Sequence, residues 1–270
     1  TGIILWVTAD PTRILPNGTS TSTITAHVTD LEGAPLQGES VTITTDISRF
    51  VGDVASITGN TSDQGILSAM LVSLTTPNTA TLTATCEGTT ARTYVEFADA
   101  ATILKKKYTE EEMFSRFVVP TMGARSAQIN RGLMPGLREP LRNPQRKIRD
   151  MEEKKLARSV LSSTPFAFYY EIEDDLAVEL AQFQNDQLGE MVKKYPDSFA
   201  AMATLPLQVP QAALQELERV IHKLGLRGIE IGSHVGKREL GDRVFWPIYE
   251  VLEKERLPIF IHPHHVAGMD

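Results

Sequence analysis

Three histidines stand close together near the end of the sequence, in the run His262, Pro263, His264 and His265. The five residues 258–262 are mostly apolar and have the length of a strand, so His262 would stand at the end of a buried strand. A neutral imidazole at such a strand end is a good ligand for zinc or a similar divalent ion. The pattern therefore predicts a metal-ligating His262, and histidines of an ordinary loop are the alternative.

The elements that would position these histidines alternate between helices and short apolar strands. We predict helices over 173–194, 210–224 and 244–255, the last with Asp242 as a cap. Strands are predicted over 157–162, 199–205, 228–232 and 258–262. Strands that alternate with helices form a parallel sheet, and strand starts roughly thirty residues apart favour a (β/α) barrel.

A doubly wound open sheet is the alternative to the barrel, although no glycine-rich dinucleotide motif follows a predicted strand. In either fold the functional residues lie at the carboxyl ends of the strands. The segments to examine there are 162–165, 205–207, 232–234 and 262–265.

The first hundred residues have a different pattern. Threonine occupies every second position of 79–86, which predicts a half-buried strand and not a helix. Gly, Pro, Asn and Asp clusters separate several such segments, as in a two-sheet β-sandwich. The predicted strands are 3–7, 23–28, 40–45, 66–74, 79–86 and 91–97.

Charge and composition exclude several classes of protein. The first hundred residues carry three arginines, no lysine and ten acidic residues, whereas residues 101–270 carry 24 basic and 24 acidic residues. Such an acidic surface is a poor partner for nucleic acid or an anionic membrane. No apolar run reaches eighteen residues, so we expect no membrane insertion. The single cysteine, Cys86, cannot form an internal disulfide, so cysteine usage does not indicate whether the protein resides in a reducing or an oxidising compartment.

The first segment contains a series of short motifs, namely Ala9-Asp10-Pro11, Asn17 to Ile24, Val28-Thr29-Asp30, Gly33-Ala34-Pro35-Leu36 and Asp63-Gln64-Gly65-Ile66. In these motifs it resembles the bacterial immunoglobulin-like domain of invasin and intimin type surface proteins. This resemblance implies an extracellular spacer or adhesion module without catalytic activity, and we interpret its one histidine, His27, as structural.

The second segment also contains a series of motifs, which include Leu161 to Pro165, Asn185-Asp186, Tyr195 to Phe199, Ala203 to Gln208, Gly228 to Val235 and Phe260 to Pro263. In these motifs it resembles the amidohydrolase-related decarboxylases, which include aminocarboxymuconate-semialdehyde decarboxylase. The resemblance implies about strands 2 to 5 of a metal-dependent (β/α)8 barrel. It also implies decarboxylation of a small unsaturated or aromatic acid, or hydrolysis by the same type of site.

Individual residues carry over from this second resemblance. His262 matches the ligand of the fifth barrel strand, which implies a divalent metal: zinc, with manganese as the alternative. Arg138 falls where the family binds the substrate carboxylate, and Arg131 competes for that role. His264 stands two residues after the ligand, where a substrate-facing catalytic side chain is expected, and His234 ends the preceding strand.

The sequence also departs from the decarboxylase pattern. Residues 98–134 contain no histidine, so the His-x-His pair of the first strand is missing, and later ligands would follow Asp270. A catalytic zinc needs about three protein ligands, so we expect the chain to be inactive as it stands. The resemblance to the decarboxylases makes a homodimer plausible for the intact enzyme.

We therefore predict two domains, an all-β immunoglobulin-like sandwich over 1–97 and a partial TIM-type barrel over 115–270, joined by a linker over 98–114. The barrel segment suggests a cytoplasmic enzyme, and the sandwich suggests the cell surface. The rival interpretation is an extracellular adhesion or spacer protein that carries a passenger half-barrel.

Overall fold

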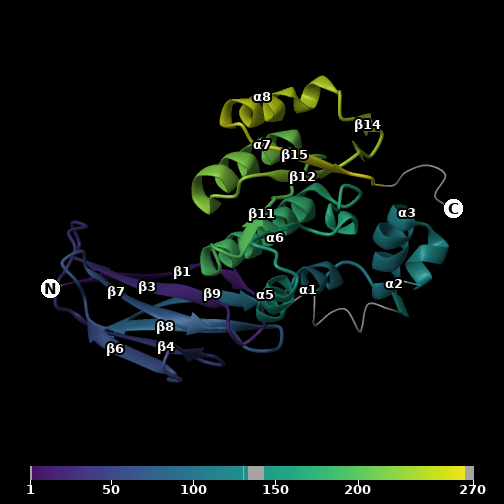
Figure 1. Ribbon diagram of the computed structural model, residues 1–270. Coiled ribbons are helices and arrows are strands. Elements are labelled where there is room, and N and C mark those ends of the chain that lie inside the picture. Colours follow the sequence, from purple (N-terminus) through teal and green to yellow (C-terminus); the bar gives the residue numbers. More distant parts are fainter. Residues whose placement is uncertain (1, 130, 133–142, 265–270) are drawn as a thin grey trace. The chain divides into compact units, whose positions relative to one another are not determined.

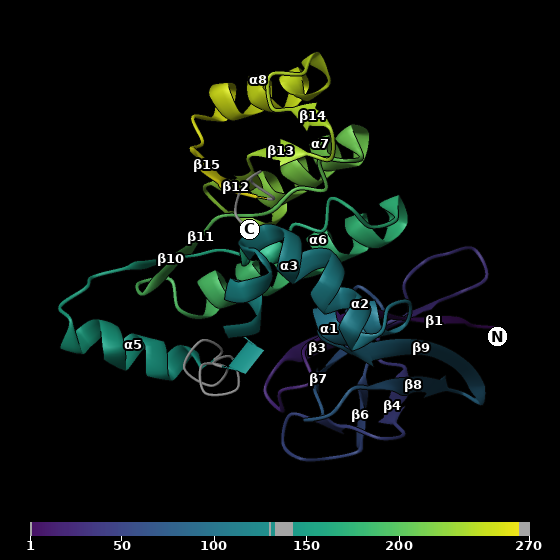
Figure 2. The same cartoon turned by 90° about the vertical axis from the view of Figure 1, so that its right-hand side faces the viewer.

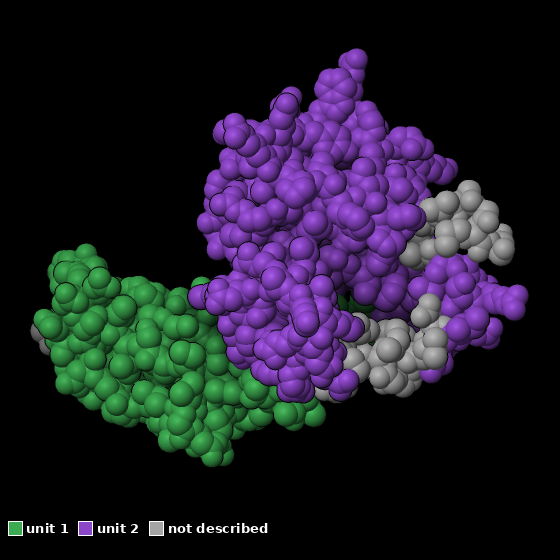
Figure 3. Space-filling view, viewed as in Figure 1, with its two compact units in different colours: residues 1–106 green, residues 107–270 purple. Residues whose placement is uncertain are grey.

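The computed structural model describes residues 2–129, 131–132 and 143–264. The chain divides into two compact units, unit 1 over residues 1–106 and unit 2 over residues 107–270 (Figure 3). This division falls inside the predicted linker 98–114, and the predicted domain boundaries themselves stay a prediction. Every helix in the described ranges is too short or too polar to cross a membrane.

Unit 1 is built from two β-sheets, as predicted (Figure 1). One sheet has the order β1-β3-β7-β5 and the other the order β2-β9-β8-β4-β6. The strands are β1 (Ile4–Asp10), β2 (Arg13–Ile14), β3 (Thr21–Thr29), β4 (Ser40–Thr45), β5 (Arg49–Phe50), β6 (Ser56–Asn60), β7 (Ile66–Val72), β8 (Asn78–Cys86) and β9 (Thr89–Phe97). The all-β prediction is confirmed, and the sequence pattern missed only the short strands β2, β5 and β6.

Strand β8 shows why these residues form sheets. Its alternate residues Ala80, Leu82, Ala84 and Cys86 are fully buried, whereas the threonines between them are partly exposed. Successive side chains of a strand point to opposite faces, so the small apolar row enters the core and the β-branched row faces outward. The core contains equally buried residues from both sheets, including Ile24 and Ile43.

The junction is helical and its charges are paired. Helix α1 (Ala100–Lys105) begins after Asp99, whose side chain accepts from the Thr102 amide at 2.7 Å. Lys106 pairs with Glu96 at 2.5 Å in unit 1. The next helices are α2 (Glu110–Met113), the π-helical turn 114–118, α3 (Val119–Met122) and α5 (Pro144–Glu153).

The alternating elements predicted for unit 2 are present. The parallel strands are β10 (Ser159–Leu161), β11 (Phe199–Ala201), β12 (Ile229–Gly232) and β15 (Ile259–His262). The helices are α6 (Asp174–Lys194), α7 (Pro210–Arg219) with a π turn over 220–224, and α8 (Trp246–Glu255). A short hairpin, β13 (His234–Val235) and β14 (Arg238–Glu239), follows β12, and Asp242 caps the 3-10 turn before α8, as predicted.

The four strands lie in chain order (Figure 2). Strand β10 pairs in parallel with β11, a bridge from Ala203 to Ile229 joins the next pair, and β12 pairs in parallel with β15. A doubly wound sheet reverses its strand order at a switch point, whereas barrel strands follow one another without reversal. The order of the described strands is that of an arc of a barrel.

The two faces of this arc carry different residues. Ala203, Ile229 and Ile231 belong to a core with residues of α7 and α8 such as Leu217 and Ile248. The opposite face, which we call the inner face, carries the intervening residues. These are Met202, Thr204, Glu230, Gly232 and His262, as the strand register requires.

Candidate active site

His262 lies at the end of β15, opposite Gly232 of β12. Its Nδ1 is 2.8 Å from the Pro263 carbonyl oxygen. A carbonyl only accepts, so Nδ1 donates and the neutral ring keeps its Nε2 lone pair for a ligand. The side chain is half-buried. This geometry suits the predicted role of His262 as a metal ligand, which stays a prediction.

His264 is buried among aromatic rings. The residue is 1% exposed, and its ring meets the rings of Phe168 and Tyr170 edge-on, with 5.5 Å between centroids in each case. Its Nε2 is 3.3 Å from the Glu171 carboxylate. Ser233 Oγ accepts from the His264 amide and donates to the His264 carbonyl, each at 3.2 Å. The predicted catalytic role of His264 is untested and stays a prediction.

His234 and His264 come together at this end of the sheet. Their ring centroids are 6.0 Å apart, and His234 Nδ1 is 3.3 Å from Ser233 Oγ. Two histidines that are thirty residues apart in the sequence are thus neighbours, because β12 and β15 are adjacent parallel strands that end at the same edge.

Tyr170 covers the end of β12. Its hydroxyl accepts from the Gly232 amide at 3.2 Å, and burial raises the pKa of Tyr170 well above its ordinary value, so the phenol stays neutral. A Cβ at Gly232 would stand 3.0 Å from both the Tyr170 ring and the His264 Cβ. Only glycine permits this close approach of the two side chains.

The backbone before Tyr170 is strained. Tyr169 has a φ of 55°, which is uncommon for a residue with a side chain, and its carbonyl accepts from Gln208 Nε2 at 2.8 Å. The strain allows Phe168 and Tyr170 to stack at 5.6 Å. Sequence reasoning missed this aromatic cluster, although the run from Phe166 to Tyr170 begins four residues after the end of the strand predicted over 157–162.

Asn185 on α6 holds the backbone of Thr204 just past β11. Its Nδ2 donates to the Thr204 carbonyl and its Oδ1 accepts from the Thr204 amide, each at 2.9 Å. Two residues earlier the Met202 amide still donates to Leu161 of β10. Because β10 has ended, the side-chain amide of Asn185 takes the place of a neighbouring strand.

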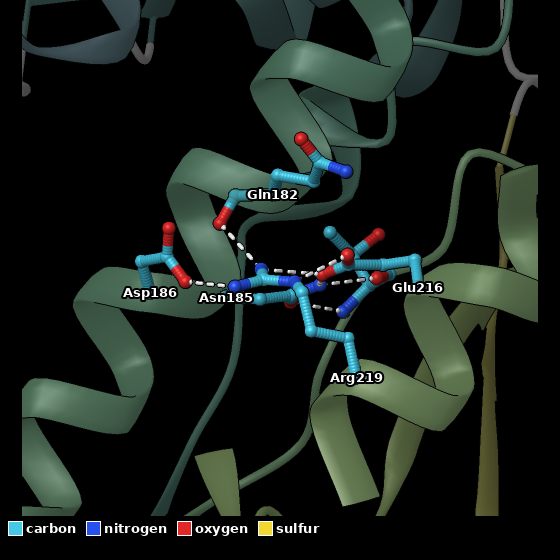
Figure 4. Close-up of polar contacts among 6 residues, drawn as sticks. Gln182, Asn185, Asp186, Glu216 and Arg219 are labelled. Carbon is cyan, nitrogen blue, oxygen red and sulfur yellow. Dashed lines mark hydrogen bonds and ion pairs between the residues drawn. The ribbon is translucent and has the colours of Figure 1, made fainter. Parts of the chain in front are cut away.

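A charged network fixes Asn185 in turn (Figure 4). Asn185 Nδ2 also donates to the buried Glu216 carboxylate at 2.7 Å. Arg219 donates to Glu216 at 2.7 and 2.8 Å and to Asp186 at 2.5 Å, and these hydrogen bonds, that to Glu216 first, raise the pKa of Arg219. Arg219 also donates to the Gln182 carbonyl. Such a satisfied network makes the end of β11 rigid.

Glu230 on β12 is a further buried acid of the inner face. Its side chain shares that face with Thr204 and His262, and the residue is only 3% exposed. The predicted site did not include it, because a single acid inside an apolar strand gives no motif. A buried carboxylate within a parallel strand is nevertheless uncommon enough to direct attention to it.

Of the two arginines predicted to bind the substrate carboxylate, Arg131 is among the described residues. Arg138 lies outside the described residues. Arg131 pairs with Glu111 at 3.2 Å, and its guanidinium lies 4.6 Å from the centroid of the Phe114 ring. Arg131 is thus held by the junction helices, and the predicted carboxylate-binding role of Arg138 stays a prediction.

The described residues do not form a complete metal site. Among them, no group of three His, Cys, Asp or Glu side chains lies close enough to hold a metal ion. His262 fits one ligand position by its tautomer and its place at a strand end. A catalytic centre needs about three protein ligands, so this ligand set does not fit a catalytic metal without further donors.

Two family profiles match the chain. Residues 6–100 match "Invasin, domain 3", and residues 138–269 match "Amidohydrolase". Each match covers less than half of the chain: residues 6–100 are similar to invasin domain 3 and residues 138–269 are similar to the amidohydrolase family, in agreement with both resemblances.

Most of the similar curated proteins are decarboxylases, and one is the 2-keto-4-carboxy-3-hexenedioate hydratase of a Sphingobium species, 30% identical over 125 residues. The 2-amino-3-carboxymuconate-6-semialdehyde decarboxylase of Dictyostelium discoideum is 37% identical over 128 residues, which are 47% of this chain and 36% of that protein. The gamma-resorcylate decarboxylase of a Polaromonas species is 30% identical over 143 residues, which are 50% of this chain and 44% of that protein. The chain thus spans between about a third and a half of the length of these relatives.

A solved structure is similar in the same region. It is the 5-carboxyvanillate decarboxylase of Novosphingobium aromaticivorans, with bound manganese and 3-methoxy-4-hydroxy-5-nitrobenzoic acid. The sequence identity is 35%, the match covers 44% of this chain and 34% of that chain, and the TM-score is 0.41.

Proposed function

We propose that residues 115–270 are a portion of a decarboxylase barrel that acts on a small aromatic or unsaturated carboxylic acid. The observation that carries this proposal is the amidohydrolase-family match over 138–269 with decarboxylase relatives. Hydrolysis by the same type of site is the alternative. The proposed domains are 1–97 and 115–270, with 98–114 as the linker.

In this proposal the chain's own residues bind and orient the substrate. Arg138 binds the carboxylate, because a guanidinium forms two parallel hydrogen bonds with it. His264 contacts the substrate, and the ring of Phe168 keeps water away from it. His262 supplies one ligand for a divalent metal, zinc or manganese, and further donors must complete the site. No reaction step through the metal follows from the described residues, and we propose that the chain alone is inactive.

Metal uptake tests this proposal. The purified chain is dialysed against Zn²⁺ or Mn²⁺, and bound metal is measured by mass spectrometry for the wild type and for His262→Ala. The matched control is His222→Ala, because His222 is exposed and pairs with Glu218 in the same helical segment. We expect weak uptake that His262→Ala abolishes and His222→Ala retains. Equal uptake by all three proteins would remove His262 from the proposed site.

Activity is measured separately with gamma-resorcylate as the test substrate. We expect no release of CO₂ from the chain alone, with either metal. Release that stops on His262→Ala would contradict the proposed inactivity but support the proposed ligand.

The second candidate function is an extracellular adhesion or spacer role for unit 1. The invasin domain 3 match and a complete two-sheet core support it. Protease treatment of intact source cells, followed by detection with an antibody against unit 1, distinguishes the candidates. Loss of the signal favours the surface protein, and retention until lysis favours the enzyme.

A further inference from the structure

Two buried polar side chains stand next to each other on the inner face of the unit 2 sheet. The bridge between Ala203 and Ile229 places the next residues, Thr204 and Glu230, opposite each other on adjacent parallel strands. The same register holds one step earlier, since a Cβ on Gly228 would lie 3.0 Å from the Met202 side chain. Thr204 and Glu230 therefore project from the same face at neighbouring positions.

Both side chains keep unused hydrogen-bonding capacity. Thr204 is 2% exposed and Glu230 is 3% exposed. Within the described part of the chain, the Thr204 hydroxyl and the Glu230 Oε2 have no hydrogen-bond partner. An unsatisfied buried polar group lowers stability, and a buried carboxylate lowers it most. Each such group in a folded protein calls for an explanation, and a binding role is one that fits two such groups side by side.

The position is also held rigidly. Both backbone groups of Thr204 bind the Asn185 side chain, which Glu216 and Arg219 fix. The Glu230 amide donates to the Ala203 carbonyl at 2.8 Å, so the two strands cannot shift against each other without breaking the bridge. A binding position requires this kind of preorganisation.

An aromatic hydroxyl of the protein itself lies beside this pair. The Tyr170 ring packs over Gly232, two residues beyond Glu230 on the same face, and its hydroxyl accepts from the Gly232 amide. Phe168 stacks on one side of the ring, and His264 meets it edge-on. The surroundings of Glu230 thus already accommodate a phenol.

We propose that Thr204 and Glu230 bind a hydroxyl group of an aromatic ligand, whose ring takes the place of Tyr170 over Gly232. The inference rests on the proposed function, because it adds a specificity-determining position to the same site. The Glu230 carboxylate accepts a hydrogen bond from the ligand's hydroxyl group, and the Thr204 hydroxyl forms a second hydrogen bond with the same group. One carboxylate and one hydroxyl do not make a metal site, and no cluster of three ligands surrounds them in the described ranges.

Resorcinol is the probe, and 1,3-dimethoxybenzene is the matched compound without a donor. Binding to the full chain is measured by calorimetry and by thermal shift, without added metal. We expect Glu230→Gln and Glu230→Met to weaken resorcinol binding at least tenfold, because a charge-assisted hydrogen bond is lost. Thr204→Val should weaken it severalfold. The control Glu253→Gln makes the same change at an exposed site of α8 and should leave the affinity unchanged.

The melting temperature gives an independent measurement. If the role of Glu230 is to bind ligand, Glu230→Met should melt at the same temperature as the wild type or at a higher one, and its affinity for resorcinol should fall. A fall of several degrees on both Glu230→Gln and Glu230→Met would assign Glu230 a structural role and overturn the inference. Absence of resorcinol binding by the wild type, or equal binding by the Glu230 variants, would also overturn it.

The variant Tyr170→Ala sharpens the test. Removal of the competing ring should tighten resorcinol binding, and a second change, Glu230→Gln, should cancel this gain. A gain that persists in the double variant would show that resorcinol only fills an apolar cavity. If resorcinol binding depends on Glu230 but the chain takes up no metal, the proposed function is rejected, whereas the inferred hydroxyl-binding role of Glu230 and Thr204 stands.

Discussion

The two units differ in how completely their sheets are covered. In unit 1, residues of both sheets such as Ile24 and Ile43 are fully buried in one core. In unit 2, β12 is buried along its whole length, whereas its partner β15 is not. Ile231 is 3% exposed and its register partner Ile261 is 54% exposed.

The same contrast holds on the other face, where Glu230 is 3% exposed and its partner Phe260 is 49% exposed. An apolar strand exposed on both faces is unusual in a soluble protein, because parallel strands are normally covered on both sides. Unit 1 therefore completes its own hydrophobic core. In the arc of unit 2, by contrast, both faces of the apolar strand β15 remain partly exposed.

The largest expected effect tests this contrast directly. Ile43→Ala should destabilise unit 1 by about 3 kcal/mol, because it opens a cavity in a closed core. Ile261→Ala should change the stability of unit 2 by less than about 1 kcal/mol, since a half-exposed side chain loses little burial. Urea unfolding is followed by fluorescence, because each unit holds one tryptophan, Trp6 or Trp246. A large loss on Ile261→Ala would mean that β15 is covered in solution.

The Asn185 network should give the next largest effect. Asn185→Asp keeps the shape of the side chain, removes the donor to Thr204 and sets a carboxylate against Glu216. We expect a loss of about 2 to 3 kcal/mol in unit 2, measured by the Trp246 signal. Gln182→Ala is the control, because only the backbone carbonyl of Gln182 contacts Arg219. Equal stability of the two variants would show that the Asn185 network contributes little to the stability of unit 2.

Crowding at the strand end should have a smaller effect. Gly232→Ala would press on Tyr170 and His264 at 3.0 Å and should cost about 1 to 2 kcal/mol. Gly241→Ala is the control, since a Cβ there meets nothing within 4 Å. Near-ultraviolet circular dichroism, which reports aromatic packing, should change for the first variant alone. An unchanged spectrum for Gly232→Ala would contradict the described packing of Tyr170.

The smallest effect concerns acid pH. A hydrogen bond from Tyr108 and a contact with Lys107 at 3.0 Å lower the pKa of Glu173 to about 2. A folded-state pKa below the unfolded value of about 4.3 stabilises the fold above that value, and the stabilisation is lost as the pH falls towards 2. Glu173→Gln should therefore flatten the pH dependence of unit 2 stability between about pH 4.5 and 2. An identical slope in wild type and variant would refute the assigned pKa.

Several features of the fold could be predicted from local pattern alone. The threonine alternation of β8 requires a strand with one buried face, and the apolar spacing of α6 requires a helix with one buried face. His262 could be placed at a strand end because the preceding residues are a short apolar run. The strand predicted over 199–205 was too long, because the Asn185 side chain replaces a strand neighbour at Thr204.

The tertiary structure decided the contacts that join distant segments. Glu230 opposes Thr204 through a strand bridge, His264 meets Tyr170 and Glu171 across some ninety residues, and Asn185 reaches both Thr204 and Glu216. The periodicity of apolar residues shows which face of a helix or strand will be buried, because the hydrophobic effect favours burial of any apolar side chain. It does not report which faces meet, because register and loop path depend on the whole chain. The sequence alone therefore determined the two classes of fold and the strand end that carries His262, and tertiary packing decided which side chains surround it.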